Sequence, residues 1–552
     1  MRLSPEARAL FEVPKDQVTP NELLSYMLKS QIDLLWFGGI GTYIKAAHES
    51  DQDVGDRAND AIRINGGDVR STVLGEGANL GVTQLGRVEY AFNGGRLNTD
   101  SIDNSAGVDC SDHEVNIKIL IDSVVDKGGL SIPQRNKLLA SMTREVGELV
   151  LRHNYLQTQA MSMIEAKGVH TLDNQIRLMR MLERVDRLNR DVEFLPNDEM
   201  LEERALAKQG LSRPEIAIVM SYAKIWLYDE ILASDLPDDP KLEEDLLEYF
   251  PMALRGKYRR EIGRHRLSRE IITTRVTNSM INRVGGTFIS EFMEKTGKSP
   301  PEIARAYTIA REVFQLRGLW DAIEKLDNKV PAETQAEMLL DINHLIDWVT
   351  LWFLRNGKAG LDIGSHVKEF QDGIGVLSDN LKNALPPHYM KDVKKRIRPY
   401  TDKGVPEALA IQIGNLVNLY SGCDIVRLAN RRKRPVPGVA KTYFAIGARF
   451  HLGLLRASAA HLESDSHWQK LAIAALIEEI YGHQLSLARQ VLDSGAKSGD
   501  SGKIIEAWVA ENAAAVAPTE QLLSELRATE INDLSMIAVA SRSLRAMADQ
   551  GS

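Results

Sequence analysis

The residues best suited to chemistry gather between Asp33 and Asn116, where glycines, amides and acids follow short apolar runs. One such run, Ile32–Phe37, leads into Gly38, Gly39 and Gly41. Because glycine has no Cβ, this turn could let a ligand approach the backbone closely. An ordinary turn at the end of a strand explains the same residues equally well, since a GGxG pattern is a weak signal.

A second apolar run, Val69–Leu74, is followed by the segment Glu76-Gly77-Ala78-Asn79. An asparagine amide offers one acceptor and two donors, which suits a carboxamide ligand. The Glu76 carboxylate could titrate or bind a ribose hydroxyl. On the residues alone, the simpler explanation is favoured, in which Asn79 stabilises its own loop.

The run Ser111-Asp112-His113-Glu114 looks like a catalytic cluster, but neighbouring residues on a helix point in different directions and cannot all converge. Ser111 with Glu114 three residues later matches a capping box, which predicts that a helix begins here. His113 could act as a general base, although a lone histidine near a helix start is more often structural.

Two short strands must position these residues. They are separated by residues 42–70, which are polar and compatible with a helix, so the pattern predicts a βαβ unit in a parallel sheet. Ligands bind at the carboxyl edge of such sheets, where both glycine turns would lie. No GxGxxG follows a strand anywhere in the chain, so the usual pyrophosphate-binding turn is absent from it.

From Asn116 onward the apolar spacing predicts one helix after another. A helix is expected from Ile132 to Lys167, with Gly168 as its C-terminal cap. Further helix starts are predicted where a serine or threonine precedes a proline and a glutamate by the spacing of a capping box. These starts are Thr19, Ser212 and Ser299.

Length and composition limit the class of protein. A chain of 552 residues implies two to four domains. A net charge of −8 gives no general attraction to nucleic acid. The basic run Arg427–Arg434 could bind phosphates, but a solvated helix end is the favoured interpretation.

Cys110 and Cys423 are the only cysteines, so a disulfide framework is not expected and a reducing cytoplasm fits. No Cys/His cluster in the sequence suggests a metal site. No apolar run approaches the roughly 20 residues that span a bilayer, so no membrane association is expected.

Several long segments together resemble the C-terminal part of the large bacterial NAD-specific glutamate dehydrogenases. The resemblance covers nearly the whole chain, and its most specific segments are Asp33–Ala46, Val54–Ile64, Leu74–Arg87, Gly94–Leu120, Leu211–Lys224 and His265–Gly285.

This resemblance implies the fold and the reaction. The implied fold is mainly helical: an α/β part, the end of a Rossmann-like NAD-binding catalytic domain, over residues 1–120, a helical connecting segment over 121–205, and a C-terminal helical domain over 206–552. The implied reaction is the NAD-linked oxidative deamination of L-glutamate to 2-oxoglutarate and ammonia, in a cytoplasmic homo-oligomer.

A fainter similarity to short-chain glutamate dehydrogenases implies roles for single residues. Gly38 and Gly39 stand where that family has a Pro-Ala-Ala turn, and the Glu76–Asn79 segment matches one that places an asparagine at the nicotinamide carboxamide. By this similarity the expected cofactor-binding residues are Gly38, Gly39, Glu76, Gly77 and Asn79. Ser111 stands where that family's serine contacts the side-chain carboxylate of glutamate.

The similarity has departures. Glycines replace the two alanines of the turn, and Asp112-His113 replaces the aromatic pair that commonly follows the serine. The family's catalytic lysine and aspartate and its glycine-rich turn lie upstream of the matched part. We therefore expect the chain alone to have little activity and to need the N-terminal part of the same enzyme as its partner. The alternative is a non-catalytic helical module for regulation or assembly of that enzyme.

Overall fold

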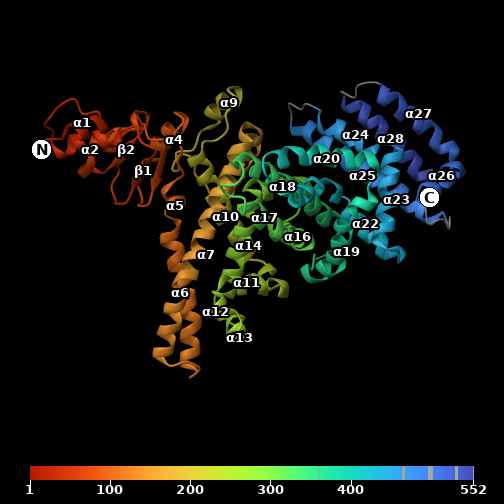
Figure 1. Ribbon diagram of the computed structural model, residues 1–552, viewed down its shortest axis with the longest axis horizontal. Helices are drawn as coiled ribbons and strands as arrows, with labels where there is room; N and C mark the ends of the chain where they lie inside the picture. Colours follow the sequence, from red (N-terminus) through yellow and green to blue (C-terminus); the bar gives the residue numbers. More distant parts are fainter. Residues whose placement is uncertain (359, 463–466, 495–500, 529–532, 551–552) are drawn as a thin grey trace. The chain divides into compact units, whose positions relative to one another are not determined.

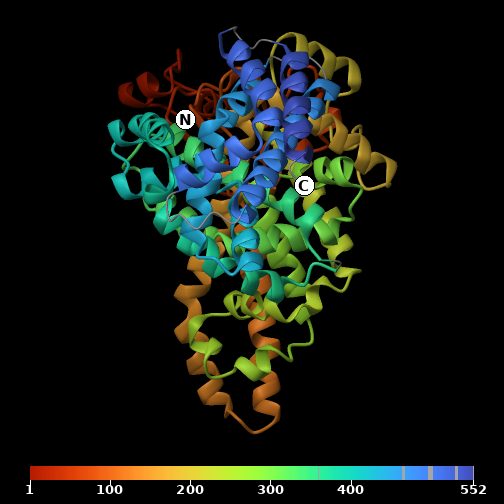
Figure 2. The ribbon, with the colours of Figure 1, turned by 90° about the vertical axis from the view of Figure 1, so that its right-hand side faces the viewer.

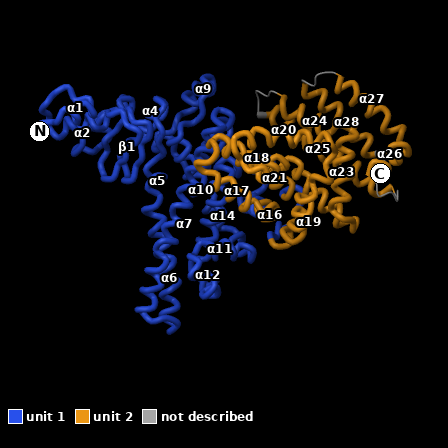
Figure 3. The backbone as a smooth tube through the Cα atoms, in the orientation of Figure 1, with its two compact units in different colours: residues 1–308, 354–363 blue, residues 309–353, 364–552 orange. Residues whose placement is uncertain are grey.

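The computed structural model describes residues 1–552 except 359, 463–466, 495–500, 529–532 and 551–552. The described chain is mainly helical, as predicted. It divides into two compact units (Figure 3). The first comprises residues 1–308 and 354–363, and the second comprises residues 309–353 and 364–552.

The α/β part of the first unit contains two small parallel sheets. Strand β1 (Leu34–Phe37) pairs in parallel with β4 (Val73–Glu76), with Leu34 opposite Val73 and Phe37 opposite Glu76. The predicted parallel pair is therefore confirmed, although the second strand lies later than the predicted 69–74. Strands β2 (Ile44–Lys45) and β3 (Ile64–Asn65) form the other sheet.

The prediction of a helical crossover over residues 42–70 is wrong. The connection holds only α3 (Asp51–Val54) and the 3₁₀ turns η1 (Arg57–Asn59) and η2 (Gly66–Asp68). Local caps keep α3 short, because Ser50 and Asp53 cap its start and Gly55, with a positive φ of 73°, follows its last residue. The larger Rossmann-like sheet implied by the resemblance is not confirmed among the described residues.

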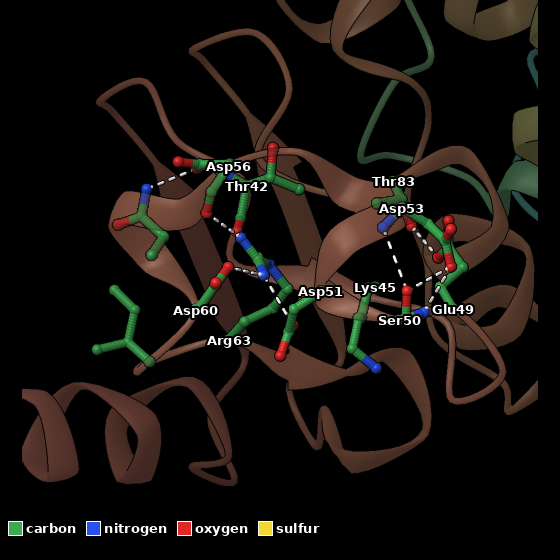
Figure 4. A network of polar contacts seen from close by, with 12 residues as sticks. Thr42, Lys45, Glu49, Ser50, Asp51, Asp53, Asp56, Asp60, Arg63 and Thr83 are labelled. Carbon is green, nitrogen blue, oxygen red and sulfur yellow. Dashed lines mark hydrogen bonds and ion pairs between the residues drawn. The ribbon is translucent and has the colours of Figure 1, made fainter.

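A buried arginine holds this connection together instead (Figure 4). Arg63 donates hydrogen bonds to the carboxylates of Asp51 and Asp60, at 2.7 and 2.6 Å, and its guanidinium is fully buried. It also donates to the backbone oxygens of Thr42 and Asp56. These bonds join both ends of the connection, so its irregular path needs no long helix.

The two sheets share one apolar cluster. It combines buried residues of all four strands with Val82 and with Tyr90 of α4 (Gln84–Phe92). Burial of this cluster supplies the main stabilisation of the α/β part.

The next elements are α5 (Asp100–Asp103), α6 (Ser105–Asp126) and α7 (Ile132–Lys167), of which α6 and α7 lie side by side in Figures 1 and 2. The predicted bounds of α7 are confirmed, with Gly168 at its C-cap. The predicted helix start at Ser111 is wrong, because α6 already begins at Ser105. The Ser111–Glu114 pattern thus lies inside the helix.

The remaining elements of the first unit are helical. The helix starts predicted at Thr19, Ser212 and Ser299 are confirmed, because the glutamate three residues later accepts a hydrogen bond from each backbone N–H. The helices and turns are α1 (Pro5–Leu10), α2 (Pro20–Leu28), η3 (Gly168–Thr171), α8 (Leu172–Arg184), α9 (Asp198–Leu206), α10 (Arg213–Leu232), η4 (Leu236–Asp238), η5 (Pro240–Leu242), α11 (Glu243–Tyr249), α12 (Met252–Arg255), α13 (Arg259–Ile262), α14 (Ser268–Val284) and α15 (Thr287–Thr296).

The described residues of the second unit are all helical or in turns and loops. Three helices have residues in both units: α16 (Pro300–Val313), α18 (Ala332–Asn356) and α19 (Ile363–Ala384). The others are α17 (Leu316–Glu324), α20 (Pro387–Asp402), α21 (Glu407–Gly414), η6 (Leu416–Leu419), α22 (Gly422–Arg432), α23 (Val436–Arg449), α24 (Leu452–Ala460), α25 (His467–Asp493), α26 (Ser501–Glu511), α27 (Ala513–Ala528) and α28 (Leu534–Gln550). Among the described helices of both units, none is long and apolar enough to cross a membrane.

Candidate functional site

A polar cavity of about 490 Å³ lies in the first unit, beside the loop that follows β4. Its walls come from that loop, from α5 and α6, and from the helices α7, α10 and α14. The lining residues are Asn79, Asp100, Ser101, Asn104, Ser105, Val108, Asp109, Asp112, His153, Gln157, Lys224 and Asn278.

The loops after β1 and β4 lie next to each other, because the two strands are parallel and in register. The Ala78 N–H donates to the Phe37 carbonyl at 3.1 Å and joins the two loops. A Cβ built on Gly38 or Gly39 meets no atom within 4 Å, so packing does not require glycine at either position. Gly41 differs, because its φ of +136° and an Asn59 atom at 2.7 Å exclude a side chain.

Glu76 is fully buried in an ion pair. Its carboxylate accepts two hydrogen bonds from Arg87, at 2.7 and 2.9 Å, and one from the Val82 N–H at 3.1 Å. Burial raises the pKa of the Glu76 carboxyl, and the Arg87 bonds oppose that rise. The carboxylate therefore holds the loop in place and is not presented to the cavity.

Gly77 and Asn79 occupy different surroundings within the same loop. A Cβ on Gly77 would lie 2.5 Å from the Trp36 indole, so packing explains this glycine. Asn79 is exposed, lines the cavity, and accepts a hydrogen bond from the Asn104 amide at 3.0 Å. The Leu80 N–H donates to Asp100 at 2.9 Å, which fixes the loop just beyond Asn79.

Ser111 is exposed in the second turn of α6, which begins at Ser105. The cavity is lined by the α6 face that carries Ser105, Val108, Asp109 and Asp112. Ser111 lies to one side of that face, because each residue advances about 100° around a helix. The structure thus places Asn79 in the cavity wall and Ser111 on the neighbouring surface.

Two basic residues of the cavity were missed by the sequence analysis. The His153 Nδ1 atom lies 2.8 Å from an Asp109 carboxylate oxygen. Lys224 donates to Gln157 at 3.1 Å, and burial lowers the pKa of its ammonium to about 7, with Asp109 opposing the shift. No local pattern could bring these groups together, since His153 stands on α7, Lys224 on α10 and Asp109 on α6.

A buried aromatic and polar group of residues adjoins the cavity at Asp112. Tyr249 donates to Asp112 at 2.8 Å and stacks on His113, with ring centroids 4.4 Å apart. Asn116 donates to the Tyr249 hydroxyl at 2.8 Å. His113 is fully buried, and burial lowers its pKa to about 4. It is therefore neutral and closed to solvent, which does not suit the role of a general base.

The basic run Arg427–Arg434 lies in the second unit. The Cζ atom of Arg427 lies over the Trp352 ring, 4.3 Å from its centroid. Arg432 donates a hydrogen bond to the Asp493 carboxylate in the same unit. Arg434 donates to the Leu492 carbonyl at 3.1 Å. Three of its charged side chains thus have contacts within the unit, which supports a helix end over a phosphate-binding patch.

Comparison with known proteins assigns relatives to both halves of the chain. Residues 1–164 match the family model "Bacterial NAD-glutamate dehydrogenase, catalytic domain", and residues 208–546 match "Glutamate dehydrogenase, C-terminal". NAD-specific glutamate dehydrogenase of Halomonas elongata is 40% identical over 550 residues, which cover 100% of this chain and 34% of the relative.

Two further relatives carry the same name. The protein of Pseudomonas aeruginosa is 40% identical, over 99% of this chain and 34% of its own length. That of Mycobacterium tuberculosis is 38% identical, over 96% of this chain and 33% of its own. The chain thus spans about a third of the length of the curated relatives it matches.

Proposed function

This chain belongs to the glutamate dehydrogenase family whose C-terminal model matches residues 208–546, and from that membership we propose that it forms part of an NAD-dependent enzyme. The reaction is the oxidative deamination of L-glutamate to 2-oxoglutarate and ammonia. The proposed location is the cytoplasm.

One structural observation supports a location for the ligand site. The cavity is lined by residues from four of the segments that resemble the family: Leu74–Arg87, Gly94–Leu120, Leu211–Lys224 and His265–Gly285. The last two segments are far in the sequence from the first two. Their meeting around one polar cavity is the arrangement expected of a ligand site.

The loops beside the cavity have the properties that a nicotinamide group requires. The space over Gly38 and Gly39 is open, so a flat ring could approach the backbone there. Asn79 is exposed and oriented by Asn104, so its amide can bind a carboxamide. NAD, when bound, supplies the acceptor for the hydride. In this proposal Glu76 acts indirectly, by holding the loop that carries Gly77 and Asn79.

Ser111 is proposed as the contact to the side-chain carboxylate of glutamate. Its hydroxyl is on an exposed helix surface, where a substrate can reach it. The chain supplies this contact and the nicotinamide side of the site, whereas the proton-transfer groups are expected from the N-terminal part of the enzyme.

The exposed face of the larger sheet supports such a partner. Leu34 and Trp36 on β1 and Val73 on β4 are 54%, 57% and 37% exposed. Parallel sheets are normally covered on both faces. We propose that the N-terminal part of the enzyme covers these side chains and that the whole enzyme forms a homo-oligomer. Within this chain, the proposed domain boundaries lie near residues 120 and 205.

The test measures glutamate-dependent NADH formation by this chain alone and by this chain mixed with the N-terminal part of the Halomonas elongata relative. We expect little or no activity alone and a stable, active complex after mixing. Robust activity of the chain alone would contradict the proposal that the proton-transfer groups come from the N-terminal part of the enzyme. If the two parts are correctly folded and form a stable complex without activity, the alternative is favoured, in which the chain is a helical assembly module. The observation that supports this alternative is the separate, helical second unit.

A further inference from the structure

Three side chains that can bind a metal ion meet between α6 and α7. Asp109 and His113 stand four residues apart on α6, and His153 faces them from α7. An Asp109 oxygen lies 3.9 Å from His113 Nε2, and the other lies 2.8 Å from His153 Nδ1. One ligand atom from each residue can be chosen so that all three lie within 4.8 Å of one another.

His113 is the unusual member of this group. Its side chain is fully buried, yet neither ring nitrogen has a hydrogen-bond partner in the part of the chain that the structure describes. Buried polar atoms are nearly always paired, so an unpaired imidazole calls for an explanation. Its Nε2 atom is directed toward the side of α6 where Asp109 lies, and Tyr249 stacked on the ring limits its movement.

We propose that Asp109, His113 and His153 bind a divalent transition metal ion of the zinc class. Imidazole nitrogens with one carboxylate are a ligand set that zinc uses, with bonds of about 2.0–2.2 Å. Ligands of a tetrahedral ion at that distance lie about 3.3–3.6 Å apart. The two separations between Asp109 and the histidines bracket this range. A ligand atom of each histidine lies within 4.8 Å of the other, so binding an ion requires side-chain rotations that draw the two rings together.

The ligand types argue against calcium and magnesium. Calcium and magnesium prefer sets made of oxygen atoms, and two of these three ligands are nitrogens. The ligands stand on two packed helices, so their spacing does not depend on a loop. Asp109 and His153 also line the cavity, so a water molecule or a carboxylate could complete the coordination from there.

A simpler arrangement is possible without metal. In it, His153 donates its Nδ1 hydrogen to Asp109, and His113 stays unpaired. The two arrangements differ in one measurable property. Only a metal site gives stoichiometric binding that requires both His153 and Asp109.

The experiment uses the full chain, freed of metal with a chelator and then titrated with Zn²⁺ by calorimetry and with Co²⁺ by visible absorption. We expect one ion per chain and the absorption of a tetrahedral Co²⁺ site. His153→Gln and Asp109→Asn should each weaken binding by more than the roughly 10–100-fold that loss of an outer-shell partner costs. His170→Ala, at an exposed histidine of the same unit, should leave binding unchanged.

Thermal unfolding keeps the test decisive if a variant is less stable. Zn²⁺ should raise the Tm of the parent chain and of H170A, because an ion that binds only the folded state stabilises it. It should not raise the Tm of H153Q. The proposal would be overturned if the folded parent chain showed no stoichiometric binding. It would also be overturned if H153Q and D109N bound the ion as tightly as the parent chain does. Neither result depends on dehydrogenase activity.

Discussion

Arg87 on α4 donates two hydrogen bonds to the buried carboxylate of Glu76, from Nε at 2.7 Å and from Nη2 at 2.9 Å. Both side chains are more than nine-tenths buried. Arg87 also lies 3.2 Å from Asp100, which in turn accepts the Leu80 N–H. The pair therefore fixes the loop that carries Asn79 at both of its ends.

Loss of Arg87 should destabilise this loop strongly. Arg87→Met leaves the Glu76 carboxylate buried without its counter-ion, which typically costs about 3–5 kcal/mol. Hydrogen exchange of peptides covering residues 72–90 measures the local free energy of opening. Arg144→Ala is the matched control, because Arg144 pairs with Glu148 at a position 92% exposed and should change stability by less than about 0.5 kcal/mol.

A double variant separates the pair from its surroundings. Glu76→Leu combined with Arg87→Met removes both charges, so it should recover much of the stability that R87M loses. An R87M effect no larger than that of R144A would show that the pair does not hold the loop.

Asn79→Ala should weaken NAD binding by about tenfold, the effect of losing one or two hydrogen bonds. The affinity for NAD, or its KM in whichever form of the protein is active, measures this. Asn136→Ala on an exposed face of α7 is the control and should leave both values unchanged. If N79A binds NAD as tightly as N136A does, Asn79 does not contact the cofactor. Its role is then structural, through the hydrogen bond that it accepts from Asn104.

Ser111→Ala separates a substrate contact from a helix cap. Because Ser111 lies inside α6, alanine should keep the Tm or raise it slightly, since alanine has the higher helix propensity. The KM for glutamate should rise about tenfold while the KM for NAD stays constant. Ser131→Ala provides the contrast, because Ser131 does cap α7 and its loss should cost about 1 kcal/mol. A fall in Tm for S111A as large as that for S131A would contradict the helix start at Ser105.

Local patterns predicted what local forces decide. The capping glutamates after Thr19 and Ser212 bond within four residues of the chain, so their signal is complete in the sequence. Ser111 with Glu114 has the same spacing but no cap, because the preceding residues 105–110 are already helical. The same spacing thus occurs at a helix start and inside a helix, and it cannot distinguish the two.

Local patterns do not reveal most residues of the cavity. Asn79 was predicted as a site residue because it follows a strand and resembles a known segment. The residues around His153 give no sign of chemistry, and Lys224 lies in a family-like segment that does not single it out. Both side chains reach the cavity through tertiary packing, because α7 packs on α6 and α10 packs on α7. The prediction of a helix over residues 42–70 was wrong for a related reason. The buried Arg63 side chain stabilises this connection through hydrogen bonds to Thr42 and Asp51, which lie 21 and 12 residues earlier in the chain.

The pKa of Lys224 gives a prediction about pH. Burial lowers this pKa to about 7 from the usual value of about 10.4. Lys224 should therefore react with an amine-acylating reagent with a midpoint near pH 7 in the folded chain, and near pH 10 in the urea-unfolded chain. Mass spectrometry of the peptide that contains Lys224 measures both midpoints. Asp109→Asn should lower the folded midpoint further, because the Asp109 carboxylate favours the charged amine.

The same shift links Lys224 to stability. Between about pH 7 and 10 the unfolded chain binds this proton and the folded chain does not, so folding gains stability as pH rises through that range. Below pH 7 both states are protonated, and the full cost of burying the charge remains. Lys224→Met should remove this contribution and make the free energy of unfolding less dependent on pH between 7 and 10. Equal labelling midpoints in the folded and unfolded chains would show that Lys224 is fully hydrated, and K224M would then leave the pH dependence unchanged.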